Sequence, residues 1–186
     1  EDPEYYGLEA LVTDEMAEVA LKMKVRKPMT LAQIVKATGK EEKVLEELLQ
    51  EMSNIGLLEY NWENPKHEKQ YVLPMYVPGS AEFFNMKLDQ SKEHPVVASF
   101  FERMAFLPLQ KVTPLVPVEK AIETEYESVS VEHSSHWLDK YDGKYAAGPC
   151  SCRYSRGVLG EGCADDPEDW CIGVGDMADY LVETNK

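Results

Sequence analysis

The stretch Thr30-Leu-Ala-Gln-Ile-Val-Lys-Ala-Thr-Gly39 decides the fold of the first part of the chain. Thr30 and Gln33 occupy the N-cap and N3 positions of a capping box, which predicts that a helix begins here. Gly39 supplies the left-handed residue that commonly follows a helix end. The segment Glu41 to Ile55 then spaces its apolar residues three and four apart, which predicts a longer amphipathic helix.

An amphipathic helix is expected before this stretch and a β-hairpin after it. Apolar residues recur at helical spacing over residues 7–24. Apolar residues alternate with polar ones over residues 58–62 and again over 71–73, with a polar tip between them, which predicts a hairpin. Three helices followed by a hairpin resemble a winged helix-turn-helix, and the resemblance covers roughly residues 7–76.

This winged helix lacks the charge that DNA binding requires. In DNA-binding relatives the third helix enters the major groove, where it needs cations and amides. Residues 41–55 instead carry five glutamates against a single lysine, Lys43. Carboxylates repel phosphate, so we interpret the acidic helix as a solvated or docking face and expect no nucleic acid partner.

The overall charge has the same implication. The chain of 186 residues has a net charge of −15. Residues 1–78 carry 15 acidic and 9 basic groups, and residues 79–186 carry the other 19 and 10. Neither part has the surplus of cations that replaces counterions on a duplex. No run approaches the ~18 apolar residues of a membrane span, so we expect none.

The middle and end of the chain show weaker patterns. Helices are expected after Ser80 and from Pro95 onward, each with phenylalanines on its apolar side. Residues 144–147 are expected to be extended, and Asp176 is expected to open a final helix.

These elements define the expected fold class, which is mainly α with a small β-hairpin (α+β). A winged-helix-like domain is expected over residues 1–78, followed by a helical and extended connecting region over 79–149. Residues 150–186 form an irregular cysteine-rich segment in this scheme.

All four cysteines lie close together near the end of the chain, at Cys150, Cys152, Cys163 and Cys171. Their spacing is C-x-C-x10-C-x7-C, and the segment that carries them contains glycine and proline. Four soft sulfur ligands are the right number for a tetrathiolate centre, either zinc or iron–sulfur. Two disulfides would close no loop in the first 149 residues, so coordination is favoured over a disulfide framework.

Arg153 and Arg156 stand beside the first cysteine pair and carry positive charge. Four thiolates around zinc or a [4Fe–4S] core leave a net negative charge, which these arginines would offset while donating hydrogen bonds to sulfur. Pairing with the acidic residues of 165–169, or plain surface exposure, is the other interpretation. His133 and His136 share a helical spacing, but a surface or packing role is favoured over metal ligation.

The cysteine segment resembles a known group of enzymes. The stretches Gly148-Pro-Cys-Ser-Cys-Arg153 and Gly162-Cys-Ala-Asp-Asp-Pro-Glu-Asp-Trp-Cys-Ile-Gly-Val-Gly-Asp176 are similar to the C-x-C-R … C-x3-P-x3-C segment of multidomain iron–sulfur and FAD-dependent pyridine nucleotide oxidoreductases of anaerobic bacteria. In those proteins a winged-helix-like region precedes the cysteines, and ferredoxin-type clusters follow them. The resemblance implies these cluster ligands: Cys150, Cys152, Cys163 and Cys171.

On this resemblance the chain is the N-terminal part of a larger cytoplasmic oxidoreductase. Its cluster, a [4Fe–4S] centre, would transfer single electrons or brace the fold, and the part seen here would be non-catalytic or an electron-transfer portion. FAD and NAD(P)H would bind only in domains beyond Lys186. The expected partners are other domains of the same polypeptide or a redox partner protein.

Two other functions stay open at this point. The four cysteines would equally suit a zinc-stabilised interaction module whose acidic winged helix docks a protein. A redox-sensing transcription regulator is the third interpretation, although the acidic third helix speaks against it.

Overall fold

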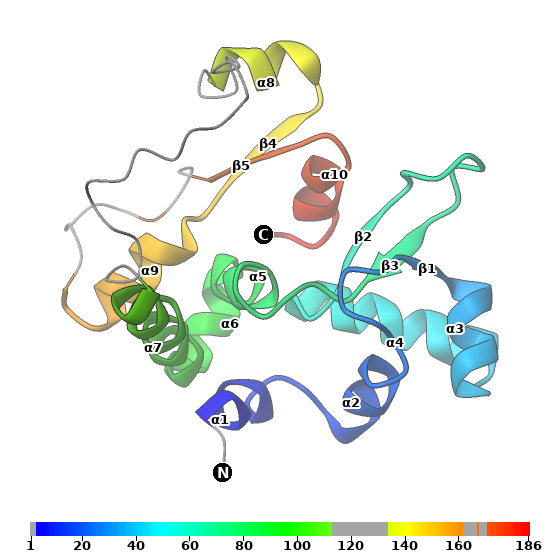
Figure 1. Ribbon diagram of the computed structural model, residues 1–186, viewed down its shortest axis with the longest axis horizontal. Coiled ribbons are helices and arrows are strands. Elements are labelled where there is room, and N and C mark those ends of the chain that lie inside the picture. The colour runs from blue at the N-terminus through cyan, green and yellow to red at the C-terminus, as the bar shows by residue number, and fades with distance from the viewer. Residues whose placement is uncertain (1–2, 113–133, 162–166, 168–170) are drawn as a thin grey trace.

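The computed structural model describes residues 3–112, 134–161, 167 and 171–186 (Figure 1). Within them the fold is mixed α+β, with many helices and two small antiparallel sheets. This confirms the predicted fold class. None of the described helices has both the length and the apolar character needed to cross a bilayer.

The first part of the chain is a winged helix-turn-helix. The three-stranded sheet has the order β1-β3-β2 and is antiparallel throughout, with Tyr60 opposite Tyr71. This order of helices and strands confirms the prediction for this region. The elements and their bounds are α2 (Asp14–Ala20), β1 (Met29–Thr30), α3 (Leu31–Thr38), α4 (Glu42–Ile55), β2 (Glu59–Asn61) and β3 (Gln70–Val72).

The local signals act as predicted. The Thr30 N–H donates to Oε1 of Gln33 over 2.9 Å, so the capping box forms. Gly39 and Gly56 follow α3 and α4 with φ values of 71° and 101°, the left-handed region that glycine adopts without strain. Gly56 has a second reason, because a Cβ there would lie 2.8 Å from the backbone of Phe83.

Two features differ from the expectation. The single helix expected over residues 7–24 is divided into α1 (Pro3–Glu9) and α2. Thr13 separates them, because its Oγ1 accepts the Met16 N–H over 3.3 Å and caps α2. Strand β1 was not expected. Its two residues are too few to show alternation, and it forms by pairing with the distant strand β3.

The remaining helices and strands follow the winged helix in the chain. Helix α7 begins at Pro95, β4 forms where an extended run was expected, and α10 opens at Asp176, as predicted. Residues 150–186 contain more regular structure than expected. Strand β5 pairs with β4, which precedes the first cysteine in the sequence. The bounds are α5 (Ser80–Met86), α6 (Leu88–Glu93), α7 (Pro95–Val112), α8 (Ser134–Lys140), β4 (Tyr145–Gly148), α9 (Ser151–Val158), β5 (Cys171–Val174) and α10 (Asp176–Glu183).

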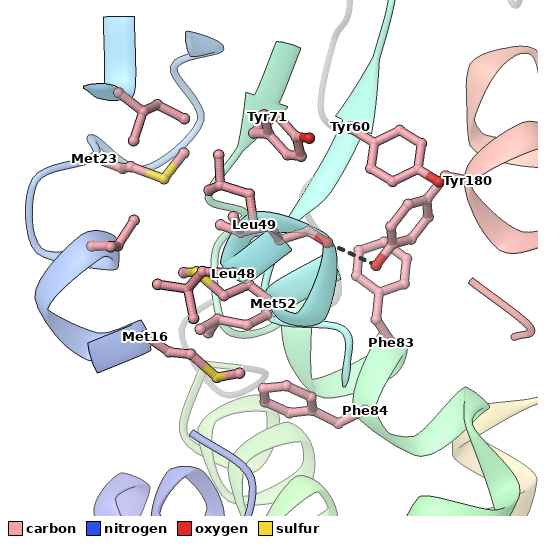
Figure 2. Packing of buried hydrophobic residues seen from close by; sticks show 14 of the residues in the cluster. Met16, Met23, Leu48, Leu49, Met52, Tyr60, Tyr71, Phe83, Phe84 and Tyr180 are labelled. Atoms are coloured by element: carbon pink, nitrogen blue, oxygen red, sulfur yellow. Dashed lines mark hydrogen bonds between the residues drawn. The ribbon is translucent and has the colours of Figure 1, made fainter. Parts of the chain in front are cut away.

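One hydrophobic core joins these elements. It combines fully buried side chains of α4, such as Leu49, with Phe84 of α5 and Tyr180 of α10. Figure 2 shows the Tyr180 ring among Tyr60 and Phe83, with ring centroids 5.1 Å from each. Edge-on aromatic pairs of this kind stabilise a core beyond the area that they bury. Helix α10 is therefore part of the winged-helix core, and it lies beside β2 in Figure 1.

Polar contacts reinforce this packing at the wing. The Trp62 N–H donates to Oδ2 of Asp176 over 2.8 Å, and the Tyr60 hydroxyl donates to Glu183 over 2.6 Å. Lys144, just before β4, bonds Oδ1 of Asp176 over 2.6 Å. One carboxylate at the start of α10 thus joins the wing to the hairpin β4–β5.

Tyr180 also bonds the backbone near the carboxyl end of α4. Its hydroxyl donates to the Leu58 carbonyl over 2.8 Å and lies 3.3 Å from the Ser53 carbonyl. We expect Tyr180→Phe to lower the free energy of unfolding by about 1–2 kcal/mol, because the Leu58 carbonyl loses this buried partner. Urea unfolding at equilibrium measures the loss. Tyr145→Phe is the control, since that ring is exposed, and an equal effect of both variants would contradict the prediction.

The side-chain amine of Lys186 is also buried at the carboxyl end of α4. Nζ donates to the Ser53 and Asn54 carbonyls over 2.8 and 3.2 Å. Burial, with a smaller effect of the Lys87 charge, lowers the pKa of Lys186 to about 6.

This buried amine predicts a pH dependence of stability. The unfolded amine has a pKa of about 10.4, so between pH ~6 and ~10 the unfolded chain binds a proton that the folded chain does not. The free energy of unfolding should therefore rise with pH over this range, and Lys186→Met should flatten the rise. Urea midpoints from about pH 6 to 9 test this, with the exposed Lys92→Met as control. Equal slopes in wild type and Lys186→Met would contradict it.

Candidate metal centre

Antiparallel pairing of β4 and β5 brings the described cysteines together. Gly148 lies opposite Cys171, the first residue of β5. Cys150 follows Gly148 by two residues and is the N-cap of α9, and Cys152 lies in the first turn of that helix. The pairing of β4 with β5 therefore places Cys171 next to Cys150 and Cys152, which are about twenty positions away in the sequence. Cys163 lies outside the described residues.

The three described thiols interact with one another. The Cys150 thiol is near enough to act on Cys171 through its charge and its side chain, and the Ser151 N–H at the start of α9 favours the Cys171 thiolate and so opposes the rise of its pKa. Cys152 is near enough for its charge to act on Cys171. The Cys150 N–H donates to the Pro167 carbonyl over 2.7 Å, which places Pro167 beside the same point. All three cysteines are free thiols.

This crowding perturbs the thiol pKa values. Burial raises the pKa of Cys171 to about 11, helped by the neighbouring Cys150 and Cys152, while the Ser151 N–H opposes the rise. Burial and then the charge of Cys150 raise the pKa of Cys152. Without a cation the thiols of Cys152 and Cys171 therefore keep their protons at neutral pH. A metal ion that replaces those protons would relieve the repulsion among the sulfurs.

The donor set fits a thiolate-bound metal or cluster. Sulfur is the ligand that zinc and iron–sulfur clusters take, and amide N–H groups directed at sulfur stabilise the thiolate. Among the described residues, no three ligating side chains are placed to hold one ion. The formed part is the Cys150–Cys171 pair with Cys152 beside it. Cys163 would complete the set, and the assignment of all four as ligands stays a prediction.

The two arginines of α9, Arg153 and Arg156, differ in what the structure shows around them. Arg156 pairs through Nε with Oε2 of Glu102 over 3.3 Å and through Nη1 with Glu161 over 3.0 Å. Both of these partners are glutamates of the described residues. Pairing of the arginines with the acidic residues of 165–169 stays a prediction, because those acidic residues lie outside the described residues. Arg153 is half-buried on the same helix. A role of either arginine beside the sulfurs stays a prediction.

Glu102 is a site residue that sequence reasoning missed. It lies on α7, is only 4% exposed, and accepts a hydrogen bond of 2.5 Å from Ser155 Oγ on α9. A glutamate in a helix is usually exposed, so nothing in the sequence of this helix marked Glu102 as a buried site residue. Only the packing of α7 against α9 reveals it.

Comparison of the chain with protein-family models, with curated protein sequences and with solved structures finds no match. The resemblance to iron–sulfur oxidoreductases therefore stays a prediction from the sequence, and the geometry of the described cysteines defines the candidate site.

The raised thiol pKa can be tested by alkylation. In the metal-free, reduced chain we expect the iodoacetamide reaction of Cys171 to accelerate about tenfold per pH unit from pH ~8 up to the pKa of about 11. In urea the same thiol should level off above its ordinary pKa of about 8.5. Mass spectrometry of the Cys171 peptide measures both rates. Equal native and unfolded rates at pH ~8 would contradict the crowded geometry.

Proposed function

We propose that the chain is the cluster-binding module of an iron–sulfur oxidoreductase, in which four cysteines hold an iron–sulfur cluster for electron transfer or structural bracing. The contact between Cys150 and Cys171 across the hairpin, with Cys152 in the next turn, carries the proposal. Cysteines that are distant in sequence gather here as free thiols, which a centre of this kind requires.

The chain's own residues would tune such a centre. A bound [4Fe–4S] cluster accepts and donates single electrons. The Ser151 N–H favours the Cys171 thiolate, and amide groups that act on cluster sulfurs in this way favour the reduced, more negative state. Cys150 and Cys171 are half-buried, which limits their contact with water, whereas Cys152 is more exposed. The exposed side is where an electron would enter or leave.

The winged helix supplies a docking surface in this proposal. Its longest helix, α4, directs exposed glutamates to solvent and buries its leucines. This acidic face suits a basic surface on another domain of the same polypeptide or on a redox partner protein. FAD and NAD(P)H belong to such partner domains. The exposed acidic residues of α4 are Glu42, Glu46, Glu47 and Glu51.

Anaerobic reconstitution tests the cofactor. We expect the chain to take up about four irons and four sulfides, with broad visible absorbance and an EPR signal on reduction. Cys163→Ser and Cys171→Ser should each lose most of the iron, because one ligand is missing. Ser99→Ala, a surface change on α7, is the control and should load fully.

The other outcomes separate the alternatives. Stoichiometric zinc that iron does not displace would overturn the electron-transfer proposal and favour a zinc-stabilised docking module. Uptake of neither metal by the folded chain would overturn both. Salt-sensitive binding to duplex DNA would instead support a regulator.

A further inference from the structure

Glu102 of α7 is a buried carboxylate beside the cysteine centre. Helix α7 lies against α9, which starts at Cys150 and carries Cys152. An ionised carboxylate is costly to bury unless charged and hydrogen-bonded partners compensate it. Among the described residues, the partners of Glu102 are Ser155 and Arg156, both on α9, so α9 helps to offset this cost while it stays in place.

Ser155 is the central contact of this arrangement. Its side chain is fully buried, and its Oγ lies 2.5 Å from Oε1 of Glu102 and 3.3 Å from the Cys152 carbonyl. The other oxygen of Glu102 faces Nε of Arg156 at 3.3 Å. One serine thus connects a buried anion of α7 to the backbone of a cysteine one turn earlier on α9.

Helix α9 needs such an anchor. It has eight residues, about two turns, and a helix this short is not stable by itself in water. Gly157 and Val158 at its far end are exposed. The orientation of its first turn, where Cys150 and Cys152 lie, therefore depends on contacts made along its length.

We propose that Glu102 is a positioning residue for the cysteine centre: through Ser155 and Arg156 it fixes α9 so that Cys150 and Cys152 face Cys171. The inference rests on the proposed function, because it concerns the same metal-binding cysteines. It predicts that metal affinity depends on the hydrogen bond between Glu102 and Ser155, which touches neither the metal nor a sulfur.

The test must separate position from charge, because the Glu102 carboxylate also acts electrostatically on Cys152. Glu102→Gln and Glu102→Leu remove the same charge and have similar volumes. Only glutamine keeps an acceptor for Ser155 Oγ. We expect Glu102→Leu to bind Co²⁺ about tenfold more weakly than Glu102→Gln, the size of effect seen for residues that orient metal ligands.

Co²⁺ is titrated anaerobically into the full chain with a non-thiol reductant present, and thiolate–cobalt absorbance gives the Kd. Glu161→Gln is the matched control. Glu161 is the other partner of Arg156, but its side chain is 63% exposed, so we expect no change in Kd. Ser155→Ala keeps both charges and should weaken binding about tenfold, in agreement with Glu102→Leu.

If Glu102 only stabilised the fold, its substitution would change the Tm and not the Kd for Co²⁺. In that case Glu102→Leu and Ser155→Ala would lower the Tm of the metal-free and Co²⁺-loaded chains equally and leave the Kd at the wild-type value, which would overturn the inference. If Glu102→Leu fails to fold by circular dichroism, Ser155→Ala decides. Failure of the wild-type chain to bind Co²⁺ through its cysteines would instead overturn the proposed function.

Discussion

The carboxyl end of α4 is the constraint on which the rest of the fold depends. The last carbonyls of a helix have no partner within it, and in a protein core water does not supply one. Side chains from distant parts of the chain donate hydrogen bonds to these carbonyls. The winged helix and the C-terminal segment therefore stabilise each other. The donors are Lys87 just before α6 and Gln90 within it, together with Tyr180 and Lys186 at the end of the chain.

This constraint extends to the cysteines through two short steps. Tyr180 fixes α10, and β5 directly precedes that helix, so the position of Cys171 follows from the packing of α10. Gly173 lets the strand lie this close, because a Cβ there would meet a Leu181 methyl at 2.6 Å. Pairing with β4 then sets where Cys150 lies. The packing of the core therefore determines where the cysteines of the candidate centre lie.

Which features were predictable follows from how local their causes are. The capping box at Thr30, the glycine after α3 and the hairpin are set by neighbours in sequence, and all were predicted. Strands β1 and β5 depend on partners about 40 and 25 residues away, so no short pattern revealed them. The cysteines were chosen by their chemistry. Glu102 was missed because its role exists only once α7 and α9 pack.

The two roles proposed for the cluster, electron transfer and bracing, follow from one arrangement and need not be alternatives. The described cysteines lie on α9 and β5, which pack against α7 and α10 respectively. Metal binding displaces thiol protons and stabilises only the folded arrangement, so its free energy is added to these same contacts. A metal held between α9 and β5 would therefore link the stability of these two elements, and of the helices they pack against, to its own occupancy. Loss of the cluster would loosen α9 first, because that short helix depends most on its neighbours.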